Sequence, residues 1–154
     1  MTDELSPAQH ARAIDDARQR LISFVQRCTD GDWRSAPVDG DPRPVGVITD
    51  HVADAYEYLA RYIGDLVTGQ QVDVNAALID ELNAEHASDA GAVTPAHVTG
   101  HLRSSGDALI ALIAGLEPGQ LDLGDGRVRR FAIIATRHAD DHRAQIEAAL
   151  AASV

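Results

Sequence analysis

Residues 129–151 read RRFAIIATRHADDHRAQIEAALA. Apolar side chains such as Phe131 and Ile134 recur here with the spacing typical of one face of an α-helix. His138 and His142 continue that face one helical turn apart. This stretch therefore predicts a long amphipathic helix that turns two imidazoles toward the protein core.

The same periodicity predicts four more helices upstream. Ser6 is an N-cap candidate followed by Pro7 at the first helical position, and Gln9 stands at the capping-box position. Thr94 and Pro95 form a second pair of N-cap residue and first-position proline. Glycines close the first two helices, and stretches rich in Gly and Pro read as loops. The predicted helices span about 7–30, 44–68, 74–87, 95–116 and 129–151, with loops at 33–43, 88–93 and 117–126.

Length and composition indicate one ordinary globular domain over residues 1–154. Hydrophobic residues make up 45% of the chain and aromatic residues only 4%, so Ala, Leu, Ile and Val must build the core. Amphipathic helices without a strand pattern predict an all-α fold. We expect an antiparallel four-helix bundle with one additional short helix.

Charge and terminal sequence exclude several functional classes. A net charge of -11 without a basic patch argues against nucleic-acid binding. No apolar run is long enough for a membrane span, and the first residues do not resemble a secretion signal. The single Cys28 cannot form an internal disulfide. These features predict a cytoplasmic protein that binds neither nucleic acid nor membrane.

The histidines carry the chemistry. His138 and His142 lie at positions i and i+4 of a helix, so their side chains can converge on one metal ion. His51 falls on the apolar face of another predicted helix and is the natural third ligand. Three neutral imidazoles would leave a coordination position open for water or substrate, as in catalytic sites. Imidazole suits several transition metals, of which we expect Zn²⁺ or Ni²⁺.

Two alternatives to this metal site stay open. His97 and His101 have the same spacing, although His97 lies in the first turn of its helix, where side chains are commonly hydrated. An inward histidine can also be an ordinary core residue with a hydrogen-bond partner. Other metal or nucleotide motifs, such as His-Glu-x-x-His or a phosphate-binding glycine loop, are absent from the sequence.

Three segments resemble those of the DinB-like superfamily, including its mycothiol-dependent maleylpyruvate isomerases and bacterial-thiol S-transferases. They are Gly31-Asp32-Trp33, the entry RPVGVITDHV at residues 43–52, and HADDHRAQI at residues 138–146. The last is similar to a His-x-x-x-His-Arg-Gly-Gln pattern, with Ala144 where Gly is common. The resemblance implies a four-helix bundle, a divalent metal on His51, His138 and His142, and a homodimer.

This resemblance implies a metal-dependent S-transferase that joins a low-molecular-weight thiol such as mycothiol to an electrophilic substrate. Tyr58 and Tyr62 lie on the His51 face, where they could line the pocket or simply pack. Arg130 shares the His138 face and could hold a substrate carboxylate, or lie on the solvated surface. The alternative function is a metal- or small-ligand-binding bundle without catalysis. Two further candidates, for hydrogen bonds to the ligand imidazoles, are Asp141 and Gln145.

Overall fold

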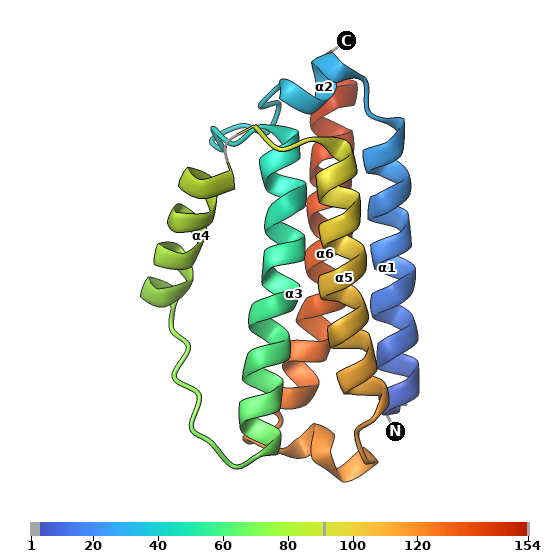
Figure 1. Cartoon of the computed structure of the whole chain (residues 1–154), viewed down its shortest axis with the longest axis vertical. Helices are drawn as coiled ribbons and strands as arrows, with labels where there is room; N and C mark the ends of the chain where they lie inside the picture. Colours follow the sequence, from blue (N-terminus) through green and yellow to red (C-terminus); the bar gives the residue numbers. More distant parts are fainter. Residues whose placement is uncertain (1–3, 91, 154) are drawn as a thin grey trace.

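The computed structural model describes residues 4–90 and 92–153, and its described part consists of helices and loops without a strand. The predicted all-α fold is therefore confirmed. Four long helices lie side by side as a bundle (Figure 1), namely α1 (Pro7–Arg27), α3 (Val45–Val67), α5 (Pro95–Ala114) and α6 (Arg127–Ala152). Three shorter elements complete it, namely α2 (Asp30–Arg34), α4 (Ala76–Ala90) and the 3-10 helix η1 (Pro118–Asp122).

Two neighbouring pairs of bundle helices are parallel rather than antiparallel. In Figure 1, α3 and α5 both run away from the end where α2 lies, whereas α1 and α6 run toward it. The segment between α3 and α5 makes this possible, because it returns the chain along the outside of the bundle and carries α4. Bundles with one long crossover connection contain such parallel neighbours. The crossover also places α4 against α3, beside the histidines.

The predicted helix starts are confirmed at two caps. The Ser6 hydroxyl accepts a hydrogen bond from the Gln9 backbone at 3.2 Å, and the Gln9 side chain accepts one from the Ser6 backbone at 2.8 Å. The Thr94 hydroxyl likewise accepts from the His97 backbone at 3.1 Å. Each cap satisfies amide groups that have no partner within the helix.

The prediction that a loop begins at residue 33 is wrong, because residues 33 and 34 belong to a helix. The Thr29 hydroxyl accepts a hydrogen bond from the Asp32 backbone and caps the short helix α2, which includes Trp33. The adjacent Gly31 obscured this cap, because glycine next to a predicted helix end reads as a terminator. Similarly, α4 continues to Ala90, three residues beyond its predicted end.

Aliphatic side chains build the core, as the composition predicts. The fully buried members include Ile14, Leu21, Ile63 and Leu102. Ile134 is an exception, because the periodicity placed it inside and the structure leaves it 46% exposed. No helix in the described part of the chain is long and apolar enough to cross a membrane.

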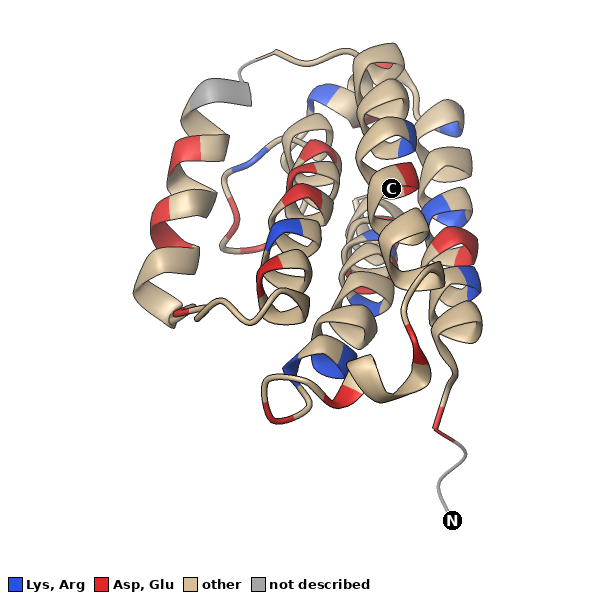
Figure 2. Cartoon of the chain, turned by 60° about the horizontal axis from the view of Figure 1, so that its bottom comes forward, with Lys and Arg blue, Asp and Glu red and all other residues tan. Residues whose placement is uncertain are grey.

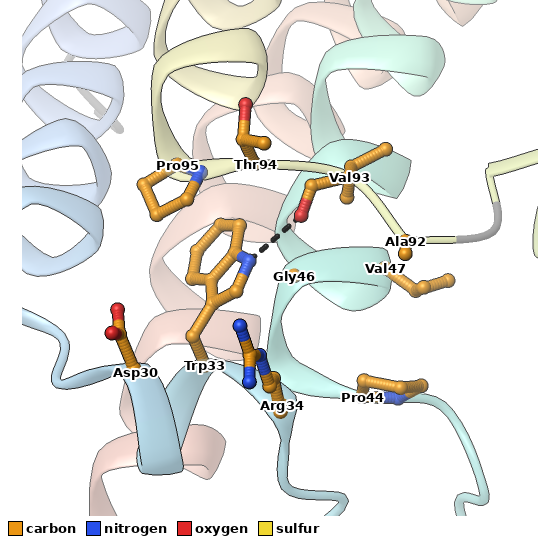
Figure 3. Close-up of a pocket in the computed structure, with 10 residues that line it drawn as sticks. All are labelled: Asp30, Trp33, Arg34, Pro44, Gly46, Val47, Ala92, Val93, Thr94 and Pro95. Carbon is orange, nitrogen blue, oxygen red and sulfur yellow. Dashed lines mark hydrogen bonds between the residues drawn. The ribbon is translucent and has the colours of Figure 1, made fainter.

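Trp33 joins α2 to the start of α3 and to the segment before α5. Its indole Nε1 donates a hydrogen bond to the Val93 carbonyl at 2.8 Å (Figure 3). The ring packs directly on Gly46, where an added Cβ would lie 2.7 Å from the indole Cε2. Only glycine lets the indole approach the α3 backbone so closely. This contact fixes the first turn of α3, five residues before His51.

We expect Gly46→Ala to lower the free energy of unfolding by about 1–3 kcal/mol, because the methyl group overpacks the indole. Gly64→Ala is the matched control in the same helix, since a Cβ there meets nothing within 4 Å. It should stabilise the chain by up to about 1 kcal/mol through helix propensity. Urea denaturation measures both changes. Equal stabilities for the two variants would show that Trp33 moves aside freely.

Candidate metal centre

The structure brings the three predicted ligands together from two helices. His51 of α3 is buried, and His138 and His142 of α6 are partly buried beside it. The Nε2 atoms of His51 and His138 are 3.0 Å apart. The ring centroids of His142 lie 5.4 Å from His51 and 4.5 Å from His138. One ring nitrogen of each histidine lies within 4.8 Å of a ring nitrogen of the other two.

These distances suit a shared metal ion. Ligand nitrogens at the usual distance from Zn²⁺ stand about 3.3 Å apart at the corners of a tetrahedron. The His51–His138 separation of 3.0 Å is close to this value. The remaining separations do not exceed 4.8 Å. The three nitrogens therefore lie close enough together to serve as ligands of one ion.

Electrostatics keep all three imidazoles in the form that binds metals. Burial, reinforced by the neighbouring histidines, lowers the pKa of His51 to about 2. Burial also lowers the pKa of His138 to about 4, and burial together with Arg43 lowers the pKa of His142. All three rings are therefore neutral at pH 7, with a lone pair free for an ion.

An apolar cavity of about 220 Å³ opens beside His51 and His138. It lies between α3, α4 and α6, and Tyr58 and Tyr62 line it together with aliphatic side chains of α4. The Tyr62 and Phe131 rings lie 5.9 Å apart in its wall. The sequence did not reveal this cavity, because the position of α4 depends on the crossover. Its full lining is His51, Ala55, Tyr58, Leu59, Tyr62, Val74, Ile79, Leu82, Asn83, Phe131, Ile134 and His138.

Three other predicted residues lie away from this cavity. Arg130 is exposed, and its guanidinium donates a hydrogen bond to the Asp125 carbonyl at 2.9 Å. Asp141 and Gln145 are exposed on α6, and the structure shows no hydrogen bond from either side chain to the histidines. Helical phase placed them near the ligands, but a side chain on the correct face can still point into solvent.

The alternative pair also belongs to a cluster. His101 Nδ1 donates to Asp50 Oδ1 at 2.7 Å, and His97 Nε2 lies 3.9 Å from the same oxygen. His86 of α4 donates from Nε2 to Asp50 Oδ2 at 2.8 Å. Asp50 and His86 are not among the site residues predicted from the sequence. The sequence did contain one indication of Asp50, because this acidic residue directly precedes His51 in a stretch of α3 that is otherwise mostly apolar.

Ion pairing shifts the titration of this second cluster. Burial by itself would raise the pKa of Asp50, but hydrogen bonds from His101 and His86 hold it well below its usual value. The Asp50 hydrogen bond, assisted by Glu57, raises the pKa of His101 to about 9 against the opposing effect of burial. The two histidine clusters thus differ, because one is neutral and the other is a charged network at pH 7.

A larger cavity, of about 420 Å³, lies around Trp33 and contains no histidine (Figure 3). The neutral histidine cluster beside an apolar cavity is therefore the stronger candidate site.

Comparison with known families agrees with this arrangement, because the model of the DinB superfamily matches residues 13–146. The chain belongs to the DinB superfamily. The match to DinB includes α3 and α6, which carry all three clustered histidines. No curated protein and no solved structure gives a significant match to this DinB chain.

Proposed function

We propose that this DinB chain holds one divalent ion on His51, His138 and His142 and is a metal-dependent thiol S-transferase. The observation that carries the proposal is the set of three neutral imidazoles, of which His51 and His138 line an apolar cavity. A bound divalent ion would supply acidification of a thiol, since a coordinated thiol loses its proton near neutral pH. Zn²⁺ or Ni²⁺ is the expected ion, and mycothiol is the expected class of thiol.

The residues of the chain divide the remaining work between binding and orientation. His51 of α3 and His138 and His142 of α6 would hold the ion between the two helices, and three protein ligands would leave a coordination position for the thiol. The apolar wall of the cavity excludes water and accepts an uncharged part of the electrophile. A new carbon–sulfur bond then forms as the leaving group departs with its electron pair, and the thiol proton passes to solvent. Cys28 is not needed as a nucleophile, and burial raises its pKa to about 11.

A second candidate function is a metal- or small-ligand-binding bundle without catalysis. One property of the cavity favours this binding function, because its lining contains no Asp, Glu, Arg or Cys side chain that could take part in catalysis. Burial and a hydrogen bond with Asp54 also raise the pKa of Tyr58 to about 12, which keeps its hydroxyl protonated. General base catalysis by the lining is therefore not supported, and an enzyme of this kind must depend on the bound ion.

Turnover of an uncharged electrophile with a panel of bacterial thiols, including mycothiol, separates the two functions. A transferase should give a metal-dependent rate above the background of the free thiol, and His142→Ala should remove that rate. Tight metal binding without any such rate would identify the binding protein instead. The metal content of each sample must be measured alongside, so that absent metal is not mistaken for absent activity.

The position of Arg130 leads to a prediction about the electrophile. Because its guanidinium is exposed and bonded to the Asp125 carbonyl, Arg130→Ala should leave KM unchanged for acidic and neutral electrophiles alike. Ala55→Trp should fill the cavity and raise KM for an apolar electrophile about 10–100-fold, the equivalent of one buried apolar side chain. Steady-state kinetics test both. An increase confined to acidic electrophiles in Arg130→Ala would restore the carboxylate-binding role.

A further inference from the structure

Two neighbouring residues of α3 each meet a histidine pair on a different helix. His51 faces His138 and His142 of α6, whereas Asp50 faces His97 and His101 of α5. Both pairs have the i and i+4 spacing that lets two imidazoles reach one ion. Because adjacent residues diverge by about 100° around a helix, they serve two separate clusters on different sides of α3.

We propose that Asp50, His97 and His101 form a second divalent-metal site. One carboxylate and two imidazoles are a ligand set that suits Zn²⁺, Fe²⁺ and related first-row metals. One ligand atom from each residue lies within 4.8 Å of the other two. The Asp50 oxygen is 2.7 Å from His101 Nδ1 and 3.9 Å from His97 Nε2, so both pairs fit within the span of ligands on one ion.

Asp50, the anchor of this second site, is buried, and His97 leaves the site open to solvent. The Asp50 side chain is only 6% exposed and is held on its other oxygen by His86. The His97 side chain is 60% exposed and forms no side-chain hydrogen bond in the structure. An ion can therefore enter from solvent past His97 and meet a carboxylate that is already fixed in position.

His86 of α4 holds the Asp50 carboxylate from the opposite oxygen. Its side chain is only 8% exposed, and its Nδ1 is buried without a hydrogen-bond partner among the described residues. Its Nε2 donates a hydrogen bond to Oδ2 of Asp50, the oxygen that does not face His101. Hydrogen bonds of this kind orient carboxylates that bind metals. The His86 ring also lies 5.8 Å from the His51 ring, so this histidine of α4 stands between the two clusters.

The surrounding charge favours a cation. Acidic positions dominate α4 and the adjoining side of α3 in Figure 2. Glu57 reaches the cluster itself, with its carboxylate 2.9 Å from His101 Nε2. Apart from the histidines His51 and His86, Arg61 is the only basic residue of these two helices. Acidic side chains concentrate divalent ions near the surface, which promotes binding at a set of correctly spaced ligands.

The second site should bind less tightly than the first. Its ligands are already joined to one another by hydrogen bonds that an ion must replace, and one ligand is largely solvated. His101 must also release a proton to solvent before it can bind the ion, because the carboxylates beside it raise its pKa to about 9. We therefore expect its ion to be lost on dialysis and restored when Zn²⁺ is added. The proposal is independent of the transferase function, because it concerns different ligands and is measured by binding alone.

Equilibrium dialysis of the full chain against Zn²⁺, with elemental analysis, tests the proposal. The wild type should bind two ions per chain at saturation, and the double variant His138→Ala/His142→Ala should bind one. Adding His97→Ala to that double variant should weaken the remaining ion at least about tenfold. Because His97 is exposed, this change should not disturb folding. Asp50→Asn in the same background should abolish the remaining ion.

Ser104→Ala is the matched control, since Ser104 is exposed on α5 one turn from His101 and offers no ligand to the cluster. It should leave both ions in place. Zn²⁺ should also raise the Tm of the His138→Ala/His142→Ala variant, and this rise should vanish with His97→Ala. A double variant that binds no Zn²⁺, or one whose binding is unchanged by His97→Ala and Asp50→Asn, would overturn the second site.

Discussion

Replacing His142 with alanine is expected to remove the tightly held metal ion from the chain. The three imidazoles come from two helices, and one nitrogen of each lies within 4.8 Å of the other two, so all three can bind one ion. Loss of residues that merely orient metal ligands already weakens metal binding by about 10–100-fold. Loss of a ligand should therefore weaken it by at least about a hundredfold. Elemental analysis of untagged, dialysed protein gives the result directly.

His51→Ala and His138→Ala should behave in the same way as His142→Ala. His10→Ala is the matched control, because His10 is also buried but lies on α1, outside both histidine clusters. It should retain the ion in full. His97→Ala should also retain the tightly held ion. Retention by His142→Ala combined with loss from His97→Ala would show that the α5 pair binds the tighter ion.

Chelation of the metal is expected to lower the Tm by about 5–11 °C without unfolding the chain. An ion at a hundredfold excess over its Kd stabilises the native state by about 2.7 kcal/mol if the unfolded chain does not bind it. For a chain of this size, each kcal/mol corresponds to about 2–4 °C. The aliphatic core extends through all four long helices, so the metal-free bundle should remain folded. Circular dichroism during heating measures both outcomes.

The same experiment on dialysed His142→Ala protein controls for effects of the chelator itself, because that protein has lost the tightly held ion as well as the weaker one and should show no shift. A metal-free wild type without helical signal would contradict the expectation and indicate that the ion is required for folding. The cross-link explains the expected stabilisation physically. His51 lies 87 residues before His138, so an ion between them holds α3 and α6 together.

Sequence periodicity predicted the helices well because it reports on local structure. The caps at Ser6 and Thr94 depend on residues three positions apart, and both are present as predicted. The spacing of His138 and His142 is equally local, and it brings their rings to 4.5 Å. The prediction of a loop at Trp33 was wrong because the glycine beside it outweighed the Thr29 cap.

The membership of each cluster was harder to predict, because it depends on how helices distant in sequence face one another. From spacing alone, the pairs on α5 and α6 were equivalent partners for α3. Packing assigns Asp50 to one pair and His51 to the other. Arg130 shares a helical phase with the ligands, yet its guanidinium bonds to the nearby Asp125 carbonyl.

The sequence by itself therefore determined the helical class, the helix starts at Ser6 and Thr94, and the spacing of the histidine pair of α6, since each depends on contacts within about one turn. Only the tertiary structure decided that α3 and α5 run parallel, that α4 covers a cavity beside His51, and that Asp50 gathers a second set of imidazoles. These features follow from the crossover between α3 and α5. Its path is set by the summed packing of many weak apolar contacts, which no local pattern records.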